Sequence, residues 1–161
     1  KPKHVPDKLI FHIHGGGFIS MSSFIHQIYT ETGQKSYKSL LFRLTMVSTV
    51  ASVPEGLYDC LEAYLWTIYC FEQLYEAQPK KIIFVGDSAG GNLAAALINL
   101  CIAWKIRIPD GLVMCYPVLS VTSKKYTRSL LGTLEDMILP HTISNYAKVR
   151  MLKLGKAKMT H

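Results

Sequence analysis

Long apolar segments are missing from this chain. No run of about eighteen or more apolar residues occurs in its 161 residues, so we expect no membrane-spanning helix. Its first eight residues lack the apolar stretch of a secretory signal, and an initiator methionine is absent, which leaves open that the chain begins inside a longer protein. Internal repeats and low-complexity tracts are also absent, and the length suits about one domain.

Cysteine is scarce, and its spacing excludes the common paired sites. The four cysteines form no Cys-x-x-Cys pair, and each lies in an apolar stretch: Cys60, Cys70, Cys101 and Cys115. Free cysteines in such stretches behave as small buried apolar residues. The pattern therefore favours buried thiols over disulfides, and a reducing compartment.

Acidic residues are outnumbered by basic ones, 11 to 18, which gives a net charge of +7. Part of this excess lies near the end of the sequence, at Lys148, Arg150, Lys153, Lys156 and Lys158. We expect residues 148–161 to be a solvated, poorly ordered basic tail, with an anionic membrane surface or nucleic acid as alternative partners. No pattern of stacking aromatic residues accompanies the charge, so we expect no nucleic-acid binding.

Apolar segments with strand and helix character alternate along the chain. The pattern predicts strands at residues 8–14, 40–50, 81–85 and 112–116, and helices at 57–75, 90–104, 129–139 and 141–152. The segment 24–38 is polar and weakly patterned, and no element is assigned to it. Because the strands are apolar throughout and alternate with helices, we expect an α/β fold with a mostly parallel sheet covered on both faces.

A serine between small residues lies between a predicted strand and a predicted helix. The stretch Gly86-Asp87-Ser88-Ala89-Gly90 fits the G-x-S-x-G pattern, in which a sharp strand-to-helix turn presents a nucleophile and needs small neighbours. Such a turn places the Ala89 N–H at a helix N-terminus, where it can face a developing oxyanion. The motif predicts Ser88 as a nucleophile, with an ordinary glycine turn as the alternative.

Three glycines follow the first predicted strand. Glycines leave backbone N–H groups unobstructed by side chains, so Gly15, Gly16 and Gly17, together with the Ala89 N–H, are predicted to form an oxyanion hole. A flexible loop is the alternative for this stretch alone. Acyl transfer needs both a nucleophile and an oxyanion site, so each motif supports the other.

Two histidines, His12 and His14, precede the glycines and point to the same side of the strand. We expect His14 to order the glycine loop by hydrogen bonding rather than to act as a general base. A His-x-His pair without a third ligand does not make a metal site, so no metal is expected.

Four stretches, HIHGGGF, GDSAGGNLAAAL, RIPDGLVMCYPVL and SLLGTLEDMILP, resemble the hormone-sensitive lipase family of α/β-hydrolases, and its animal members most. The resemblance covers about residues 8–24 and 54–146. It implies a partial α/β-hydrolase catalytic domain over residues 1–147 that lacks the C-terminal strands. By the family pattern, Ser88 corresponds to the nucleophile and residues 15–17 with Ala89 to the oxyanion hole. Asp87 matches the motif residue beside the nucleophile rather than the triad acid, and Tyr116-Pro117 matches a structural strand end.

The same resemblance implies a serine ester hydrolase, a lipase or carboxylesterase that acts on apolar acyl esters such as acylglycerols or cholesteryl esters. It implies no cofactor, a small-molecule ester or lipid as partner, peripheral contact with lipid surfaces, and a cytoplasmic location that includes lipid droplets. The oligomeric state is left open.

Two departures from the family pattern leave alternatives open. The block D-Y-x-L-A-P-E is replaced by LTMVSTVASVPEG, so residues 22–53 are either divergent or read in a different frame. The triad acid and histidine should follow the serine, and none of the downstream candidates is expected to supply them: Asp110, Glu135, Asp136, His141 and His161. A non-catalytic small-ligand-binding module, as in the gibberellin receptors, and a product with no stable fold are therefore the rival interpretations.

Overall fold

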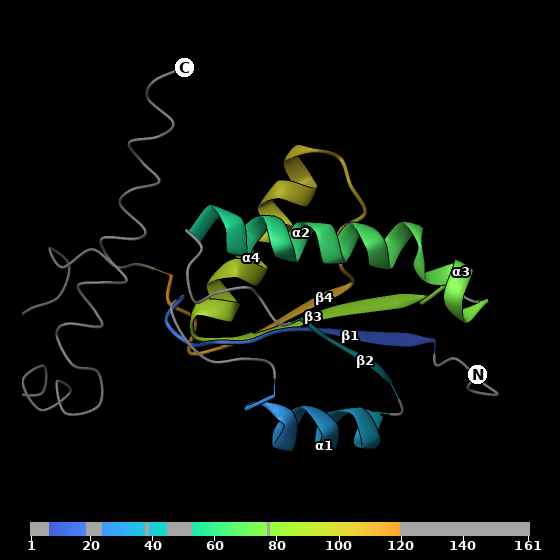
Figure 1. Ribbon diagram of the computed structural model, residues 1–161, viewed down its shortest axis with the longest axis horizontal. Helices are drawn as coiled ribbons and strands as arrows, with labels where there is room; N and C mark the ends of the chain where they lie inside the picture. Colours follow the sequence, from blue (N-terminus) through green and yellow to red (C-terminus); the bar gives the residue numbers. More distant parts are fainter. Residues whose placement is uncertain (1–6, 19–23, 38, 45–52, 77, 120–161) are drawn as a thin grey trace, which may run out of the picture.

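A four-stranded sheet with helices on both faces forms the body of the molecule (Figure 1). The computed structural model describes residues 7–18, 24–37, 39–44, 53–76 and 78–119. In chain order the elements are β1 (Lys8–Ile13), α1 (Gln27–Tyr37), β2 (Leu40–Leu44), α2 (Val53–Tyr69), α3 (Phe71–Tyr75), β3 (Lys81–Asp87), α4 (Ala89–Ala103) and β4 (Gly111–Cys115). The predicted α/β class is confirmed.

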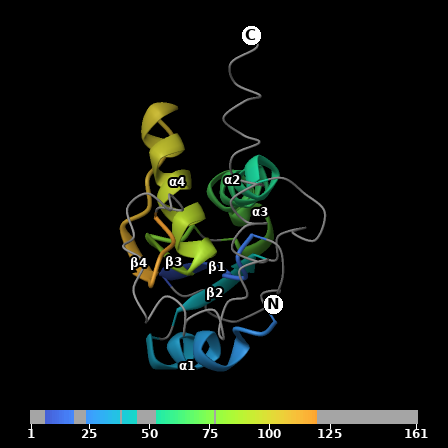
Figure 2. The same ribbon diagram turned by 90° about the vertical axis from the view of Figure 1, so that its left-hand side faces the viewer.

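The helices lie in two layers. Figure 2 shows α1 on one face of the sheet and α2, α3 and α4 on the other. Helix α4 packs on β3, and α2 packs beside α4. No described helix is long and apolar enough to cross a membrane.

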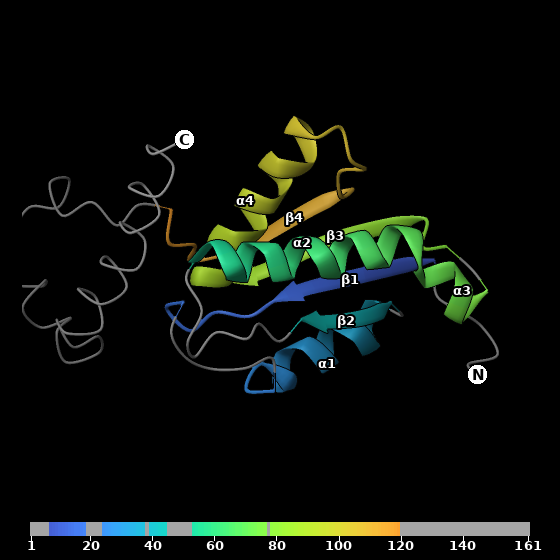
Figure 3. The ribbon, with the colours of Figure 1, turned by 45° about the horizontal axis from the view of Figure 1, so that its top comes forward.

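The four strands are parallel and lie in the order β2-β1-β3-β4 (Figure 3). Ile13 of β1 pairs with Gly86 of β3, and Asp87 of β3 pairs with Cys115 of β4. Parallel strands end at a common edge, so the segments that follow β1, β3 and β4 meet there. This edge is where open α/β sheets bind their ligands.

The apolar core lies between the sheet and the α2–α4 layer. Alternate residues of β1 and β3 enter it, because successive strand side chains point to opposite faces: Leu9, Phe11, Ile13, Ile82 and Phe84. Tyr64 of α2 meets the Phe84 ring edge-on at 4.9 Å between centroids, and its hydroxyl donates to the Arg107 carbonyl at 2.7 Å. The helix layer is thus joined to the sheet by aromatic packing and a satisfied polar group.

The opposite face of β1 lies on the α1 side of the sheet and carries buried histidines near its carboxyl end. His12 and His14, which the alternation places on this side, are both fully buried. Thr30 of α1 is also buried there, and its hydroxyl donates to the His26 carbonyl at 2.9 Å. Buried polar groups need partners, so this face depends on hydrogen bonds more than the core does.

Two sequence predictions need correction. The polar segment 24–38, to which no element was assigned, contains helix α1. The helix carries few apolar residues, so no helical pattern of apolar positions marks it in the sequence. The single helix predicted for 57–75 is two helices, α2 and α3, separated at Cys70. The first half of the strand predicted for 40–50 is present as β2. Four predicted segments lie outside the described residues: the rest of that strand at 45–50, the helices at 129–139 and 141–152, and the tail at 148–161.

Strand β4 was predicted to be buried, and that prediction is wrong. Val113 is 49% exposed and Met114 37% exposed. In the described part of the chain, β4 pairs with β3 on one side and is the edge strand of the sheet, so its apolar residues have water access. The predicted burial on both faces is therefore not found for β4.

The cysteines are free, as predicted, but only two are buried. Cys60 and Cys101 lie in the core, Cys70 is half-buried, and Cys115 at the end of β4 is exposed. Burial raises the pKa of the Cys60 thiol to about 12, so it stays protonated and unreactive at neutral pH.

The core packing predicts a large penalty for removing the Phe84 ring. Phe84→Ala should lower the free energy of unfolding by about 3–5 kcal/mol, because the cavity left between β3 and α2 cannot collapse fully. Urea denaturation followed by circular dichroism measures this. Tyr69→Ala, which removes a ring that is 66% exposed, should change stability by no more than about 0.5 kcal/mol; equal losses in both variants would contradict the placement of the core.

Candidate active site

Ser88 lies on a strained turn between β3 and α4. Its backbone has φ 51° and ψ −117°, a conformation that costs a non-glycine residue about 1–3 kcal/mol. The turn is held by the end of β4 and by the segment that follows it: the Ser88 N–H donates to the Cys115 carbonyl at 2.9 Å, and the Val118 N–H donates to the Ser88 carbonyl at 3.1 Å. Ser88 is the N-cap residue of α4, and its hydroxyl makes no capping hydrogen bond to the described first turn of that helix.

Close backbone contacts explain the small residues on either side of the serine. A methyl group at Gly86 would lie 2.6 Å from the Gly90 carbonyl oxygen. A methyl group at Gly90 would collide with the Ile13 carbonyl oxygen and lie 2.6 Å from that of His14. The first turn of α4 is therefore pressed directly against the end of β1, which brings the serine turn and the glycine loop side by side.

The glycine loop has a backbone that other residues adopt rarely. Gly16 and Gly17 have φ values of 125° and 62°, in the region that glycine enters without steric cost. His14 Nδ1 lies 2.6 Å from the Gly15 carbonyl oxygen, so this ring nitrogen carries a proton that it donates to the carbonyl. The hydrogen bond that was predicted between His14 and the glycine loop is present.

The Gly15 amide is already committed to another partner. It donates to Asp87 Oδ1 at 3.1 Å, and a methyl group at Gly15 would collide with the Asp87 carboxylate. Gly15 is thus an anchor of the loop, and its amide is not available as the predicted oxyanion donor. The oxyanion role of Gly16, Gly17 and Ala89 stays a prediction. Ala89 is the first residue of α4, where amide groups have no acceptor within their own helix.

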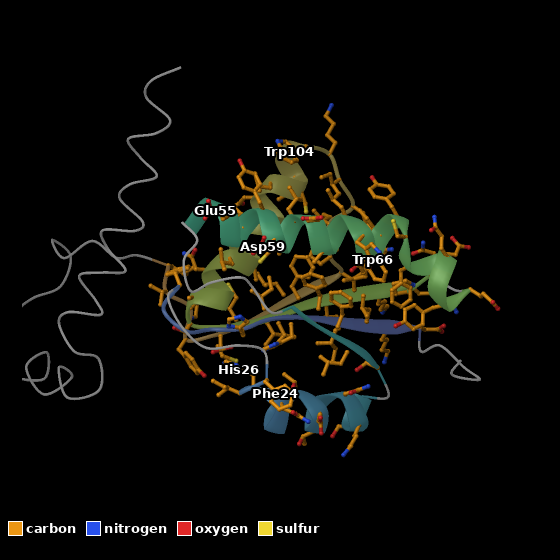
Figure 4. The ribbon with its side chains drawn as sticks, viewed as in Figure 1. Phe24, His26, Glu55, Asp59, Trp66 and Trp104 are labelled. Carbon is orange, nitrogen blue, oxygen red and sulfur yellow. The ribbon has the colours of Figure 1, made fainter. Side chains whose placement is uncertain are left out.

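Asp87 is the centre of a buried polar cluster on the α1 side of the sheet. Its Oδ2 lies 3.1 Å from His26 Nε2, and its Oδ1 lies 3.8 Å from His12 Nε2. Figure 4 shows His26 in the segment that leads into α1, on the face of the sheet that α1 covers. Burial lowers the pKa of His14 below 6.5, and the nearby His26 adds to this, while the Gly15 carbonyl and Asp87 oppose it.

Sequence analysis missed two residues that organise the site. His26 lies in the segment to which no element was assigned, 61 positions before Asp87, and no motif marks it. Asn92 Nδ2 donates to the Val118 carbonyl at 2.7 Å, so the first turn of α4 is tied to the segment after β4. Pro117 packs against Gly91, which gives the Tyr116-Pro117 strand end the structural role that was predicted.

Of the predicted triad candidates, Asp110 lies within the described residues, and it is not brought to the serine. Asp110 lies at the opposite, amino-terminal end of the sheet, where its carboxylate accepts the Ile82 N–H at 2.8 Å. The other four candidates, Glu135, Asp136, His141 and His161, lie outside the described residues. Within the described ranges, no group of three or more His, Cys, Asp or Glu side chains is arranged to hold a metal ion.

A shallow cavity of about 140 Å³ opens beside the serine turn. Its walls come from the ends of β3 and β4: Val85, Gly86, Asp87, Cys115 and Tyr116. The lining is largely apolar, with the Asp87 carboxylate at one side.

Comparison with known proteins agrees with this geometry. A family model described as "alpha/beta hydrolase fold" matches residues 10–160. The chain belongs to the α/β-hydrolase family. Hormone-sensitive lipase from Mus musculus is 33% identical over 137 residues, which are 84% of this chain and 18% of that protein. An esterase from Acinetobacter venetianus is 29% identical over 71% of this chain and 37% of its own length.

Solved structures give the same result. A hormone-sensitive lipase from a metagenome library superposes with a TM-score of 0.74 at 26% identity, over 91% of this chain and 49% of its own. Carboxyl esterase 2 from Tuber melanosporum gives a TM-score of 0.75 at 21% identity, which shows the shared fold. The chain spans about a fifth of the curated hormone-sensitive lipases it matches and about half of these solved α/β-hydrolases.

The contact at Gly90 predicts an inverted response to alanine. In an ordinary helix, Gly→Ala stabilises by about 0.5–1 kcal/mol. Here Gly90→Ala should destabilise by about 1–3 kcal/mol, because the methyl group would force α4 away from β1. Denaturant unfolding measures the change, with Asn99→Ala on the exposed face of α4 as the control; a stabilised Gly90→Ala would show that the serine turn and the β1 end are not in contact.

The buried His14 predicts a pH-dependent stability. The pKa of His14 is lower in the folded chain than its ordinary value of 6.5. The unfolded chain therefore binds more protons as pH falls below that value, and the folded chain loses stability there. The slope is at most about 1.4 kcal/mol per pH unit for one group. Urea unfolding between pH 7.5 and 5 should show a flatter dependence for His14→Gln than for the native chain, and equal slopes would contradict the burial of a neutral His14.

Proposed function

We propose that this chain carries the nucleophile and the oxyanion site of a serine ester hydrolase, a lipase or carboxylesterase. The observation that carries the proposal is the direct packing of the glycine loop on the serine turn, through the Gly90 contact with the end of β1 and the Gly15–Asp87 hydrogen bond. This packing supports a site in which one acyl group meets the Ser88 hydroxyl and the loop amides together.

In this proposal, Ser88 Oγ attacks the acyl carbonyl carbon, and the carbonyl π electrons move to its oxygen. The N–H groups of Gly16, Gly17 and Ala89 stabilise the resulting oxyanion, which the helix N-terminus of α4 also favours. The carbonyl then re-forms as the C–O bond to the alcohol breaks, and the alcohol leaves with the proton that the general base took from Ser88. Water attacks the acyl-enzyme in the same way, which releases the acid and returns a proton to Ser88 Oγ. A general base must accept the Ser88 proton; we assign that base and its acid to no described residue.

The substrate proposed is an ester with an apolar acyl group, such as an acylglycerol or a cholesteryl ester. The lipases and esterases among the similar proteins support this choice. We further propose action without a cofactor, peripheral contact with lipid surfaces, and a cytoplasmic location that includes lipid droplets.

Hydrolysis of p-nitrophenyl butyrate by the full chain tests the proposal. Ser88→Ala should lower the rate by about a thousandfold or more, because removal of a nucleophile abolishes the covalent route. Ser36→Ala, at an exposed position of α1, is the matched control and should leave the rate unchanged. A fluorophosphonate should add one adduct, mapped by mass spectrometry to Ser88.

Equal hydrolysis by the native chain and by Ser88→Ala would contradict the proposal. No hydrolysis and no adduct, with cooperative unfolding, would favour the rival binding module. No cooperative unfolding would favour the rival in which the chain has no stable fold.

A further inference from the structure

His26 has no place in the sequence motifs, yet it is buried beside the residue that precedes the nucleophile. The residue is 7% exposed and lies directly before α1. Its backbone carbonyl accepts hydrogen bonds from the Thr30 N–H at 3.2 Å and from the Thr30 hydroxyl at 2.9 Å. The first turn of α1 therefore fixes the backbone of His26, and its ring points to the sheet (Figure 4).

We propose that His26 is a positioning residue for the oxyanion loop and that it acts through Asp87. This inference rests on the proposed function. His26 Nε2 donates to Asp87 Oδ2 at 3.1 Å, and Asp87 Oδ1 accepts the Gly15 N–H at 3.1 Å. The two carboxylate oxygens belong to one rigid plane, so a bond that fixes Oδ2 also sets where Oδ1 meets the loop.

The two neighbouring histidines, His12 and His14, make other contacts. His12 Nε2 lies 3.8 Å from Asp87 Oδ1, beyond hydrogen-bond distance for that pair of atoms. The His12 and His14 rings lie 5.5 Å and 6.0 Å from the His26 ring, centroid to centroid, and His14 Nδ1 donates to the Gly15 carbonyl. The loop is thus held at Gly15 from two sides, by His14 at the carbonyl and by Asp87 at the amide.

The loss of His26 should change the rate of the chemical step more than the binding of substrate. Gly16 and Gly17 follow the anchored Gly15 directly, so a shift of Gly15 moves both proposed donors. An oxyanion exists only in the transition state and the intermediate, and groups that stabilise it alone affect kcat rather than KM. A misplacement of about 1 Å costs about a hundredfold in rate, and a partial shift should cost about tenfold or more.

Two substitutions separate the hydrogen bond from the packing of the ring. His26→Phe keeps a ring of similar size and removes the donor. His26→Gln removes the ring and keeps an amide N–H that can reach the position of Nε2. With p-nitrophenyl butyrate, kcat should fall about ten- to a hundredfold in His26→Phe with KM little changed, and His26→Gln should recover most of it.

The Gly15 amide gives a readout that does not depend on catalysis. In the native chain this N–H should exchange slowly with solvent deuterium and resonate downfield, because it donates to a buried carboxylate. His26→Phe should speed its exchange about tenfold or more in nuclear magnetic resonance spectra, and His26→Gln should not. In an Asp87→Asn background, adding His26→Phe should change kcat little further, because the link is already altered.

These readouts also separate this inference from the proposed function. Unchanged Gly15 exchange in a folded His26→Phe overturns the inference whatever the activity. Equal loss of kcat in His26→Phe and His26→Gln also overturns it, because ring packing would then be the cause. Faster Gly15 exchange in His26→Phe alone supports the link between His26 and the loop, even where Ser88→Ala shows that the proposed hydrolase function has failed.

Discussion

The arrangement of the site depends on the hydrogen bonds of the Asp87 carboxylate. A buried carboxylate costs several kcal/mol to desolvate unless its oxygens are hydrogen-bonded. Here one oxygen takes the Gly15 amide and the other takes the His26 ring, so the cost is offset by contacts that also join three separate segments. The end of β3, the loop after β1 and the start of α1 are thereby held at fixed positions relative to one another.

The strained turn at Ser88 is supported from the other side. The last residue of β4 accepts the Ser88 N–H, and the segment after β4 donates to the Ser88 carbonyl. Asn92 joins α4 to that same segment. Strain of this kind persists where surrounding contacts over-determine the backbone, and it is common at functional sites. The parallel arrangement of β1, β3 and β4 makes these contacts possible, because their carboxyl ends meet at one edge.

Much of this could be predicted from local sequence. Glycines at 86 and 90 around Ser88 marked a sharp strand-to-helix turn, and three glycines after an apolar strand marked a loop with unusual backbone angles. Both signals are local, because each reports a steric requirement at its own position.

The role of Gly15 could not be predicted in the same way, since its amide is taken by Asp87, 72 residues away. His26 was missed because its partner Asp87 is also far away in the sequence, by 61 positions. Helix α1 was missed because it carries few apolar residues. The exposure of β4 was missed because burial depends on what covers a strand, which its apolar sequence does not reveal.

The most direct test of the account is a crystal structure of the chain after reaction with a p-nitrophenyl alkylphosphonate, a stable mimic of the tetrahedral intermediate. The account predicts a phosphorus bonded to Ser88 Oγ, with one phosphonyl oxygen about 2.7–3.1 Å from the amide nitrogens of Gly16, Gly17 and Ala89, and Gly15 still bonded to Asp87. An adduct on another residue, or a phosphonyl oxygen directed away from the glycine loop, would contradict it.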